Sequence, residues 1–376
     1  MATTNGSDAT AAVSLPPVSS SEPSRESRGG RPDRRRGGGG KGAGGGARGK
    51  DGVRGKAGAR RQGGGAAGAT RVKAKVNPRI QIGTVVAPAD VVERAQHSRL
   101  LEVDASSEPL TERLVGPWVD RTPENVVLDV RAHRLLTHHA APIESIWPEV
   151  RDTLTPALRE RRQLYADDLP ARSLDAALDR FLASIASVRE FGKLGTVVFP
   201  FPSYFTPGTR SLDYLEWLRG RSDDLPIAIE LRHRDWVAGK QRDATMAFLS
   251  EHQLAYVCVD VPSGFDSSQP PLSVATTDTA FVRFHGRNSG AWEKGVDTGD
   301  DRFGYDYKDV DLEPWKARLE KLAGAAKSVH VTFSGRTTEA ATRNARLLVR
   351  ILSGEVVPEQ RPPPSGPPRK GRPRPR

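Results

Sequence analysis

Charged and imidazole side chains stand at the ends of several short apolar runs of this sequence. Carboxylates and imidazoles gathered at one place can share the roles of acid and base, or hold a divalent metal. Arginines beside them suit an anionic substrate, because the planar guanidinium matches a phosphate or a carboxylate. The residues in question are Glu102, Asp104, Glu230, Arg232, Asp260, Arg283, His285 and Arg287, with His138 at some distance after the third run.

Several of these residues also have a purely structural interpretation. Glu230 and Arg232 occupy alternate positions of one run, so they could form a buried ion pair that only shapes the site. Asp260 could cap the turn that follows it. Of the adjacent residues His138 and His139, only one is expected to face a site, and both could simply pack or be solvated.

Other residues carry weaker signals. Trp236 and Trp292 are either loop anchors or stacking surfaces for a ring or base. The single cysteine, Cys258, excludes an internal disulfide and a multi-cysteine zinc site, and its apolar run predicts a buried small residue rather than a reactive thiol. The sequence has no HExxH helix, P-loop, GxSxG elbow or CxxC pair, so the commonest named chemistries are excluded.

Alternating strands and helices must position these side chains. Apolar, β-branched runs predict strands at 79–83, 100–103, 126–130, 196–199, 227–230, 255–260, 280–284 and 330–333. Helical spacing predicts helices at 89–96, 110–119, 173–191, 211–218, 241–252, 312–325 and 339–352. Eight strands in this rhythm predict an α/β, TIM-like barrel, whose working face lies at the carboxyl ends of the strands. An open doubly wound sheet is the alternative, but no glycine-rich phosphate turn follows the first strand.

Composition divides the chain into three regions. Residues 1–75 have 16 Lys or Arg against 5 acids and almost no large apolar residue, and residues 358–376 alternate Pro with Arg or Lys. Neither region can bury a core, so we expect both to be disordered tails around a folded domain at 76–357. The tails carry +11 and +5, whereas the middle carries −5. No secretory signal or membrane span is evident, which predicts a cytoplasmic protein.

The strings IELRHRDW (229–236) and FVRFHGRNSGAW (281–292) closely resemble the YecE-like family, also called domain of unknown function 72. The likeness extends over about residues 80–352 and includes LGTVVFPFP at 194–202. The resemblance implies a barrel akin to the eight-stranded type, and it leaves the activity open because none is established for the family. The family's shared polar positions fall on Glu102, His138, Glu230, Arg232, Asp260, Arg283, His285 and Arg287.

This chain departs from the family's pattern at several positions expected at the barrel mouth. Asp104 and Pro200 stand where the family usually has Asn and Gln, and Ser334 and Gly335 replace an Asn pair. An aromatic pair of the family is also missing near residues 107 and 108. Loss of carboxamide donors at the mouth implies an altered specificity or a lost activity.

The tails contain short motifs that are similar to nucleic-acid-binding segments. Arg-Gly-Gly steps of the first tail resemble RGG segments of RNA-binding proteins, and RKGRP at 369–373 resembles an AT-hook. The alternative is a tail that is only solvated. The candidate contacts are Arg34, Arg35, Arg36, Arg369, Lys370 and Arg372.

Two hypotheses therefore remain open for the function. The first is a hydrolase or acid–base enzyme acting on an anionic substrate, phosphate-containing or sugar-like, at the barrel mouth. Its acid–base or ligand groups would be Glu230, His285, Asp260, His138 and Glu102, and its substrate-binding groups Arg232, Arg283, Arg287, Trp236 and Trp292. The second is a non-enzymatic protein that binds DNA or RNA through its tails. No motif implies a cofactor, although a divalent metal is compatible with the carboxylates.

Overall fold

The computed structural model describes residues 75–292, 302–335 and 337–355. Apart from Lys75, the predicted basic tails at 1–75 and 358–376 lie outside the described residues. The six candidate nucleic-acid contacts, Arg34, Arg35, Arg36, Arg369, Lys370 and Arg372, therefore lie outside them as well.

Eight parallel strands close into a barrel in the order β1-β10-β9-β8-β7-β6-β3-β2. This confirms the predicted α/β barrel and excludes the open sheet. The barrel strands are β1 (Ile80–Val86), β2 (Leu100–Asp104), β3 (Val127–Arg131), β6 (Leu194–Pro200), β7 (Ile227–Glu230), β8 (Leu254–Asp260), β9 (Thr279–Phe284) and β10 (Ser328–Phe333). Each overlaps a strand that the sequence predicts. Between β3 and β6, strands β4 (Ala141–Pro142) and β5 (Gln163–Leu164) form a separate antiparallel pair.

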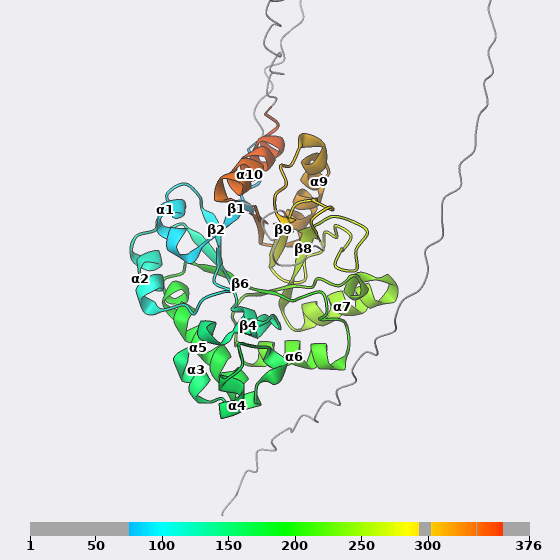
Figure 1. Cartoon of the computed structure of the whole chain (residues 1–376). Coiled ribbons are helices and arrows are strands. Elements are labelled where there is room, and N and C mark those ends of the chain that lie inside the picture. Colours follow the sequence, from blue (N-terminus) through cyan, green and yellow to red (C-terminus); the bar gives the residue numbers. More distant parts are fainter. Residues whose placement is uncertain (1–74, 293–301, 336, 356–376) are drawn as a thin grey trace, which may run out of the picture. The chain divides into compact units, whose positions relative to one another are not determined.

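Helices surround the barrel on its outside (Figure 1). The α-helices are α1 (Val91–Ala95), α2 (Glu112–Asp120), α3 (Pro148–Asp152), α4 (Pro156–Arg159), α5 (Ala171–Glu190), α6 (Thr209–Gly220), α7 (Gly239–Glu251), α9 (Asp309–Ala325) and α10 (Thr338–Ser353). Short 3-10 helices are η1 (Pro88–Asp90), η2 (Arg134–Thr137), η3 (Ile143–Ser145), η4 (Ala166–Asp168) and η5 (Arg234–Val237). All seven predicted helices are present, and the proline-rich region 137–173 is divided into short pieces, as proline requires.

The strands are buried on both faces, since side chains fill the barrel and helices cover its outside. All seven residues of β8 are buried, and so are all four of β7. Small and aliphatic side chains fill the middle of the interior, among them Val198, Ala228 and Val257. This is the arrangement expected of parallel strands, whose sequences are apolar throughout rather than alternating.

The register of the strands decides which side chains face the interior. Arg283 of β9 pairs with Thr332 of β10 on one side and with Val259 of β8 on the other. Paired residues of parallel strands point to the same face, so Val259 shares the interior with Arg283. The next residue, Asp260, therefore points outward. The same rule places Glu230 and Glu102 inside.

Cys258 also lies on the outer face of β8, and it is fully buried. Its Sγ atom donates to the carbonyl oxygen of Val274 at 3.5 Å, and burial raises the pKa of the thiol to about 11. The prediction that this cysteine is a buried residue is confirmed. No helix in the described ranges is both long and apolar enough to cross a membrane.

Candidate functional site

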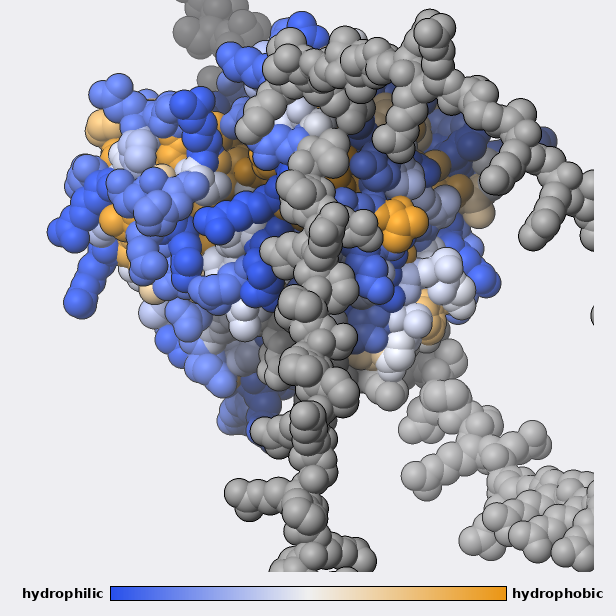
Figure 2. Space-filling model, turned by 90° about the horizontal axis from the view of Figure 1, so that it is seen from above, coloured by the Kyte–Doolittle hydropathy of each residue, from blue (hydrophilic) through white to orange (hydrophobic). Residues whose placement is uncertain are grey.

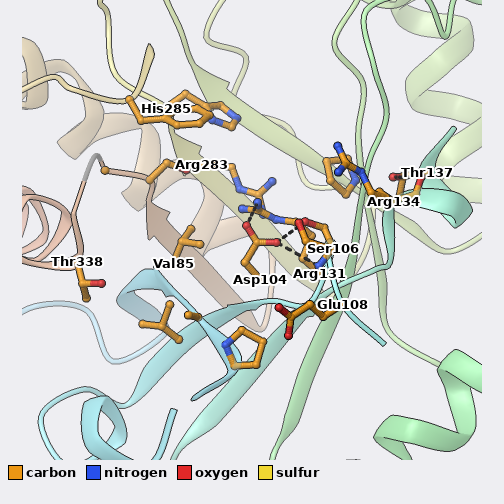
Figure 3. Close-up of a pocket in the computed structure, with 18 of the residues that line it drawn as sticks. Val85, Asp104, Ser106, Glu108, Arg131, Arg134, Thr137, Arg283, His285 and Thr338 are labelled. Atoms are coloured by element: carbon orange, nitrogen blue, oxygen red, sulfur yellow. Dashed lines mark hydrogen bonds and ion pairs between the residues drawn. The ribbon is translucent and has the colours of Figure 1, made fainter. Parts of the chain in front are cut away.

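A cavity of about 750 Å³ opens at the carboxyl ends of the barrel strands. Figure 3 shows side chains from opposite parts of the barrel converging on it, with His285 and Arg283 on one side and Arg134 and Thr137 on another. The start of α10, including Thr338, also lines the cavity. The cavity lies where α/β barrels carry their active sites.

A network of ion pairs forms the floor beneath this cavity. Glu102 is completely buried, and it accepts hydrogen bonds from Arg131, from Arg283 and, at 2.7 Å, from the Thr332 hydroxyl. Arg131 also donates to Asp104 at 2.6 Å. Burial acts to raise the pKa of Glu102, but the charges of Arg283 and Arg131 outweigh it and the pKa is lowered. Glu102 therefore stays ionised as the shared acceptor of two arginines.

Glu230 connects this floor to a histidine at the cavity wall. Its Oε2 atom accepts from Arg283, and its Oε1 atom lies 2.9 Å from Nε2 of His285. Burial acts to raise the pKa of Glu230, but Arg283, His285 and Arg232 lower it well below its usual range. Burial lowers the pKa of His285, with Arg232 and Arg283 acting in the same direction. The pair is thus a carboxylate beside a neutral imidazole.

The tautomer of His285 follows from this pairing. An ionised carboxylate can only accept, so Nε2 of His285 carries the proton that it donates to Glu230. The lone pair then lies on Nδ1, which is buried and has no hydrogen-bond partner among the described residues. A neutral imidazole oriented by a carboxylate is the arrangement of a general base.

Two arginines of the cavity wall make no hydrogen bond through their guanidinium groups to any described residue. Arg232 has only a 3.9 Å ion pair with Glu230 and a cation–π contact of 5.4 Å with Trp292. Arg134 has a buried Nε without a partner. Both arginines also act on His139. Burial, and then the positive charges of Arg232 and Arg134, lower the pKa of His139 to about 4. This wall presents guanidinium donors that make no hydrogen bond to a carboxylate of a described residue.

Several residues predicted from the sequence come together here. Glu230, Arg232, Arg283 and His285 line the cavity, and Glu102 lies directly beneath them. Trp292 packs on both Arg232 and His285, at ring distances of 5.4 and 6.0 Å, and its Nε1 donates to Ser267. Trp292 therefore helps to hold the side chains of Arg232 and His285 in place.

Asp260 and Arg287 are not brought to the cavity. The Asp260 carboxylate, on the outer face of β8, accepts from Arg287, Tyr307 and Trp315 at 2.6–2.9 Å. Trp315 belongs to α9, so this cluster joins the barrel wall to a helix. Arg287 is held between Asp260 and Asp311. The physical reason is the alternation of side chains along β8, which turns its last residue away from the interior.

His138 and Trp236 also lie away from the cavity. His138 has a left-handed backbone (φ 59°), and its ring packs 4.3 Å from Tyr214 and 5.2 Å from Phe205. Burial lowers its pKa to about 4. Trp236 stacks on Phe205 and donates to its carbonyl oxygen at 2.7 Å. Of the two adjacent histidines, it is His139 that lines the cavity.

The sequence analysis missed Arg131 and Arg134, and it left open which of His138 and His139 would face the site. Arg131 is the last residue of β3, two positions after Asp129. The search for charged residues at strand ends, which was applied to the other strands, would have identified it. Arg134 and His139 come from the irregular segment after β3, where no periodicity indicates which side chains turn inward. The departures from the family pattern are at the mouth as predicted, because Asp104, Pro200, Ser334 and Gly335 all line the cavity.

The carboxylates of the site are already engaged by arginines. Within the described ranges, no three His, Cys, Asp or Glu side chains are grouped so that they could hold a metal ion. The interior contains a second polar pair one layer further from the mouth, where His330 Nδ1 lies 2.9 Å from Asp129 Oδ1. That pair is buried and separate from the cavity.

Comparison with known proteins agrees with this architecture. The model of a family described as "Protein of unknown function DUF72" matches residues 92–368. The UPF0759 protein YunF of Bacillus subtilis is 27% identical over 266 residues, which cover 69% of this chain and 86% of that protein. A DUF72 family protein of Enterococcus faecalis V583 superposes with a TM-score of 0.59 at 24% identity, covering 73% of this chain and 97% of that one. A DUF72 family protein of Thermotoga maritima superposes with a TM-score of 0.55 at 21% identity, over 73% and 98% of the two chains.

Proposed function

Since this chain belongs to the DUF72 family, whose description states no activity, we propose its function from the chemistry of the cavity. We propose an acid–base enzyme that acts on a small anionic substrate, a phosphate ester or an acidic sugar derivative, bound at the carboxyl ends of the strands. The catalytic pair is His285 and Glu230, and the anion is held by Arg232 and Arg134.

The observation that carries this proposal is the pair of arginines whose guanidinium groups make no hydrogen bond to any residue that the structure describes. A guanidinium that is withdrawn from water without a partner is unfavourable, and a bound anion removes that cost. Phosphate and carboxylate oxygens match the guanidinium fork and give short, charge-assisted hydrogen bonds. Arg232 and Arg134 line the same cavity, so one anionic group can engage both.

The role of His285 follows from the state of its two nitrogens. Nε2 donates to Glu230, which fixes the ring and favours the tautomer with a free lone pair on Nδ1. In this proposal Nδ1, which is buried and has no partner among the described residues, accepts a proton from a hydroxyl of the substrate or from a water molecule that enters the cavity. The resulting imidazolium is stabilised by the ionised Glu230, and it can return the proton to a leaving group.

Binding and catalysis can be tested separately with the full chain. Isothermal titration with inorganic phosphate and with glucuronate measures anion binding, and Arg232→Gln and Arg134→Gln should each weaken it about ten-fold or more. Arg242→Gln, at an exposed position of α7, is the matched control and should change nothing. If neither anion binds, or if the Arg232 and Arg134 variants bind as well as the unaltered chain, the proposal is wrong.

The catalytic step is tested on 4-nitrophenyl phosphate and 4-nitrophenyl glucuronide. His285→Gln should lower kcat by about 10²-fold or more, which is the usual contribution of a general base. Its affinity for the anion should stay unchanged, because the variant keeps both arginines. If the kcat of His285→Gln equals that of the unaltered chain, the imidazole is not the general base.

A further inference from the structure

A second concave surface lies on the outside of the barrel, over β1 and between α1 and α10. It is a groove of about 830 Å³. Helix α10 has 16 residues, whereas α1 has only 5, so their lengths are about 24 Å and about 8 Å at 1.5 Å per residue. In an α/β barrel the helices cover the outer face of the strands. The short α1 leaves Ile82 on the outer face of β1 partly exposed.

The floor of this groove is aliphatic. It includes Ile82 of β1, which is partly exposed on the outer face, and Val349 of α10. Val349 is 41% exposed, although Leu348 beside it is fully buried. The α10 residues that line the groove recur at positions 342, 345, 346 and 349, the spacing of one helix face. Figure 2 shows the side of the molecule that carries α10, where hydrophobic patches lie among hydrophilic residues.

The rim of the groove is basic. Twenty described residues line it, and none of these is Asp or Glu, while Lys75, Arg94, His97, Arg99 and Arg346 are among them. This contrasts with the charge of −5 on residues 76–357 as a whole. Arg94 is paired with Glu339 at 3.1 Å. Arg99 and Arg346 are exposed and make no side-chain hydrogen bond or ion pair with a described residue.

We propose that this groove, here called the α1–α10 groove, binds an acidic amphipathic helix of a partner protein. An apolar face of such a helix would cover Ile82 and Val349, where a longer α1 would otherwise pack. Its carboxylates would meet Arg99 and Arg346 on the rim. The proposal is independent of the chemistry in the cavity, because the groove and the cavity share no lining residue.

The same features disfavour two other occupants. The terminal segments of this chain carry +11 and +5, so the basic rim repels them. Single-stranded nucleic acid is bound through bases stacked on aromatic rings, and the groove's described lining has no Phe, Tyr or Trp. A helix with apolar and acidic faces matches both the floor and the rim.

The test uses the full chain and a fluorescein-labelled peptide of the length of α10, with leucines on one helical face and glutamates on the other. Fluorescence anisotropy at physiological ionic strength measures binding. The double variant Arg99→Glu/Arg346→Glu should weaken binding about ten-fold or more, through charge repulsion at the rim. Arg242→Glu on α7 reverses an exposed charge that lies outside the groove and should have no effect. Circular dichroism verifies that each variant is folded.

A second peptide separates the groove from the basic tails, which could attract any acidic chain. Replacing its leucines by alanine keeps every glutamate, so attraction to the tails persists while binding in the apolar groove should be lost. Equal binding of the two peptides, or binding that the double variant leaves unchanged, would overturn the proposal. The proposal would also be overturned if a single-stranded DNA oligomer bound more tightly than the peptide and if the double variant abolished that binding.

Discussion

Glu102 and Glu230 stand on β2 and β7, and both accept hydrogen bonds from the same guanidinium, that of Arg283. Both carboxylates are at most 1% exposed. One cation thus compensates two buried anions, and Arg131 adds a second cation on the side of Glu102. The floor of the cavity is therefore rigid, and His285 is oriented by a carboxylate that is itself fixed.

Arg283→Met should be strongly destabilising. It leaves Glu102 and Glu230 buried without their shared cation, and breaking a buried ion pair from one side costs about 3–5 kcal/mol. Urea denaturation followed by circular dichroism measures the change in the free energy of unfolding. Arg232→Met is the matched control: its guanidinium makes no hydrogen bond with a described residue, so the variant should change stability by less than ~1 kcal/mol. Equal losses in the two variants would contradict this account of the floor.

Asp260→Asn should lower stability without affecting the cavity. The variant weakens the charge-assisted bonds from Arg287, Tyr307 and Trp315, which predicts a loss of about 1–3 kcal/mol. Titration with inorganic phosphate should give the affinity of the unaltered chain, because the carboxylate points to α9. A stable variant with impaired anion binding would instead make Asp260 part of the site.

Stability should fall as the pH is lowered from about 6.5 to about 4. Burial lowers the pKa of His133, His138 and His139 from 6.5 to about 4. Between these values the unfolded chain binds more protons than the native chain, so acidification favours unfolding; below about 4 these groups add nothing further. We expect roughly 1 kcal/mol or more from each histidine. Urea titrations at pH 7 and pH 5 check this, and His139→Gln should reduce the difference between them.

Gly195→Ala should destabilise the barrel interior. A Cβ at this position would lie 2.4 Å from Oδ1 of Asp129 and 2.6 Å from Cγ1 of Val127. Relieving that overlap requires a shift of the buried Asp129–His330 pair, at a cost of about 1–3 kcal/mol. Gly220→Ala is the control, since nothing lies within 4 Å of its Cβ. Thermal unfolding of both variants measures the contrast, and equal melting temperatures would show that the interior has spare room.

We propose that any sequence-independent affinity for nucleic acid resides in the terminal segments, which carry +11 and +5. Binding of single-stranded RNA and duplex DNA should then weaken steeply with salt, because phosphate contacts release counterions. A full-length variant with Gln at Arg34, Arg35, Arg36, Arg369, Lys370 and Arg372 should bind more weakly and with a smaller salt dependence. Arg232→Gln, which changes only the cavity, should bind as before. If the variant with these six substitutions binds nucleic acid with unchanged affinity, the binding surface lies on the barrel and not on the terminal segments.

The order of strands and helices could be predicted from the sequence because it depends on local patterns. Runs such as 227–230 and 255–260 are short, apolar and rich in β-branched residues, and the segments between them have helical spacing. Several strand ends could be predicted for the same reason, although β1 extends three residues beyond its predicted end at residue 83. Glu230 and Asp260 are each the last residue of a strand, as predicted.

Only the tertiary structure decided which of these two carboxylates serves the cavity. In a strand that is exposed on one face, apolar and polar residues alternate and identify the inner side, but all seven residues of β8 are buried. A strand buried on both faces has no such alternation, so its phase is set by pairing with its neighbours. That pairing puts Val259 beside Arg283 in the interior and turns Asp260 toward Trp315. The sequence by itself determined the order of the elements and the polar residues that end β7 and β8, and the closure of the barrel determined which of these residues meet.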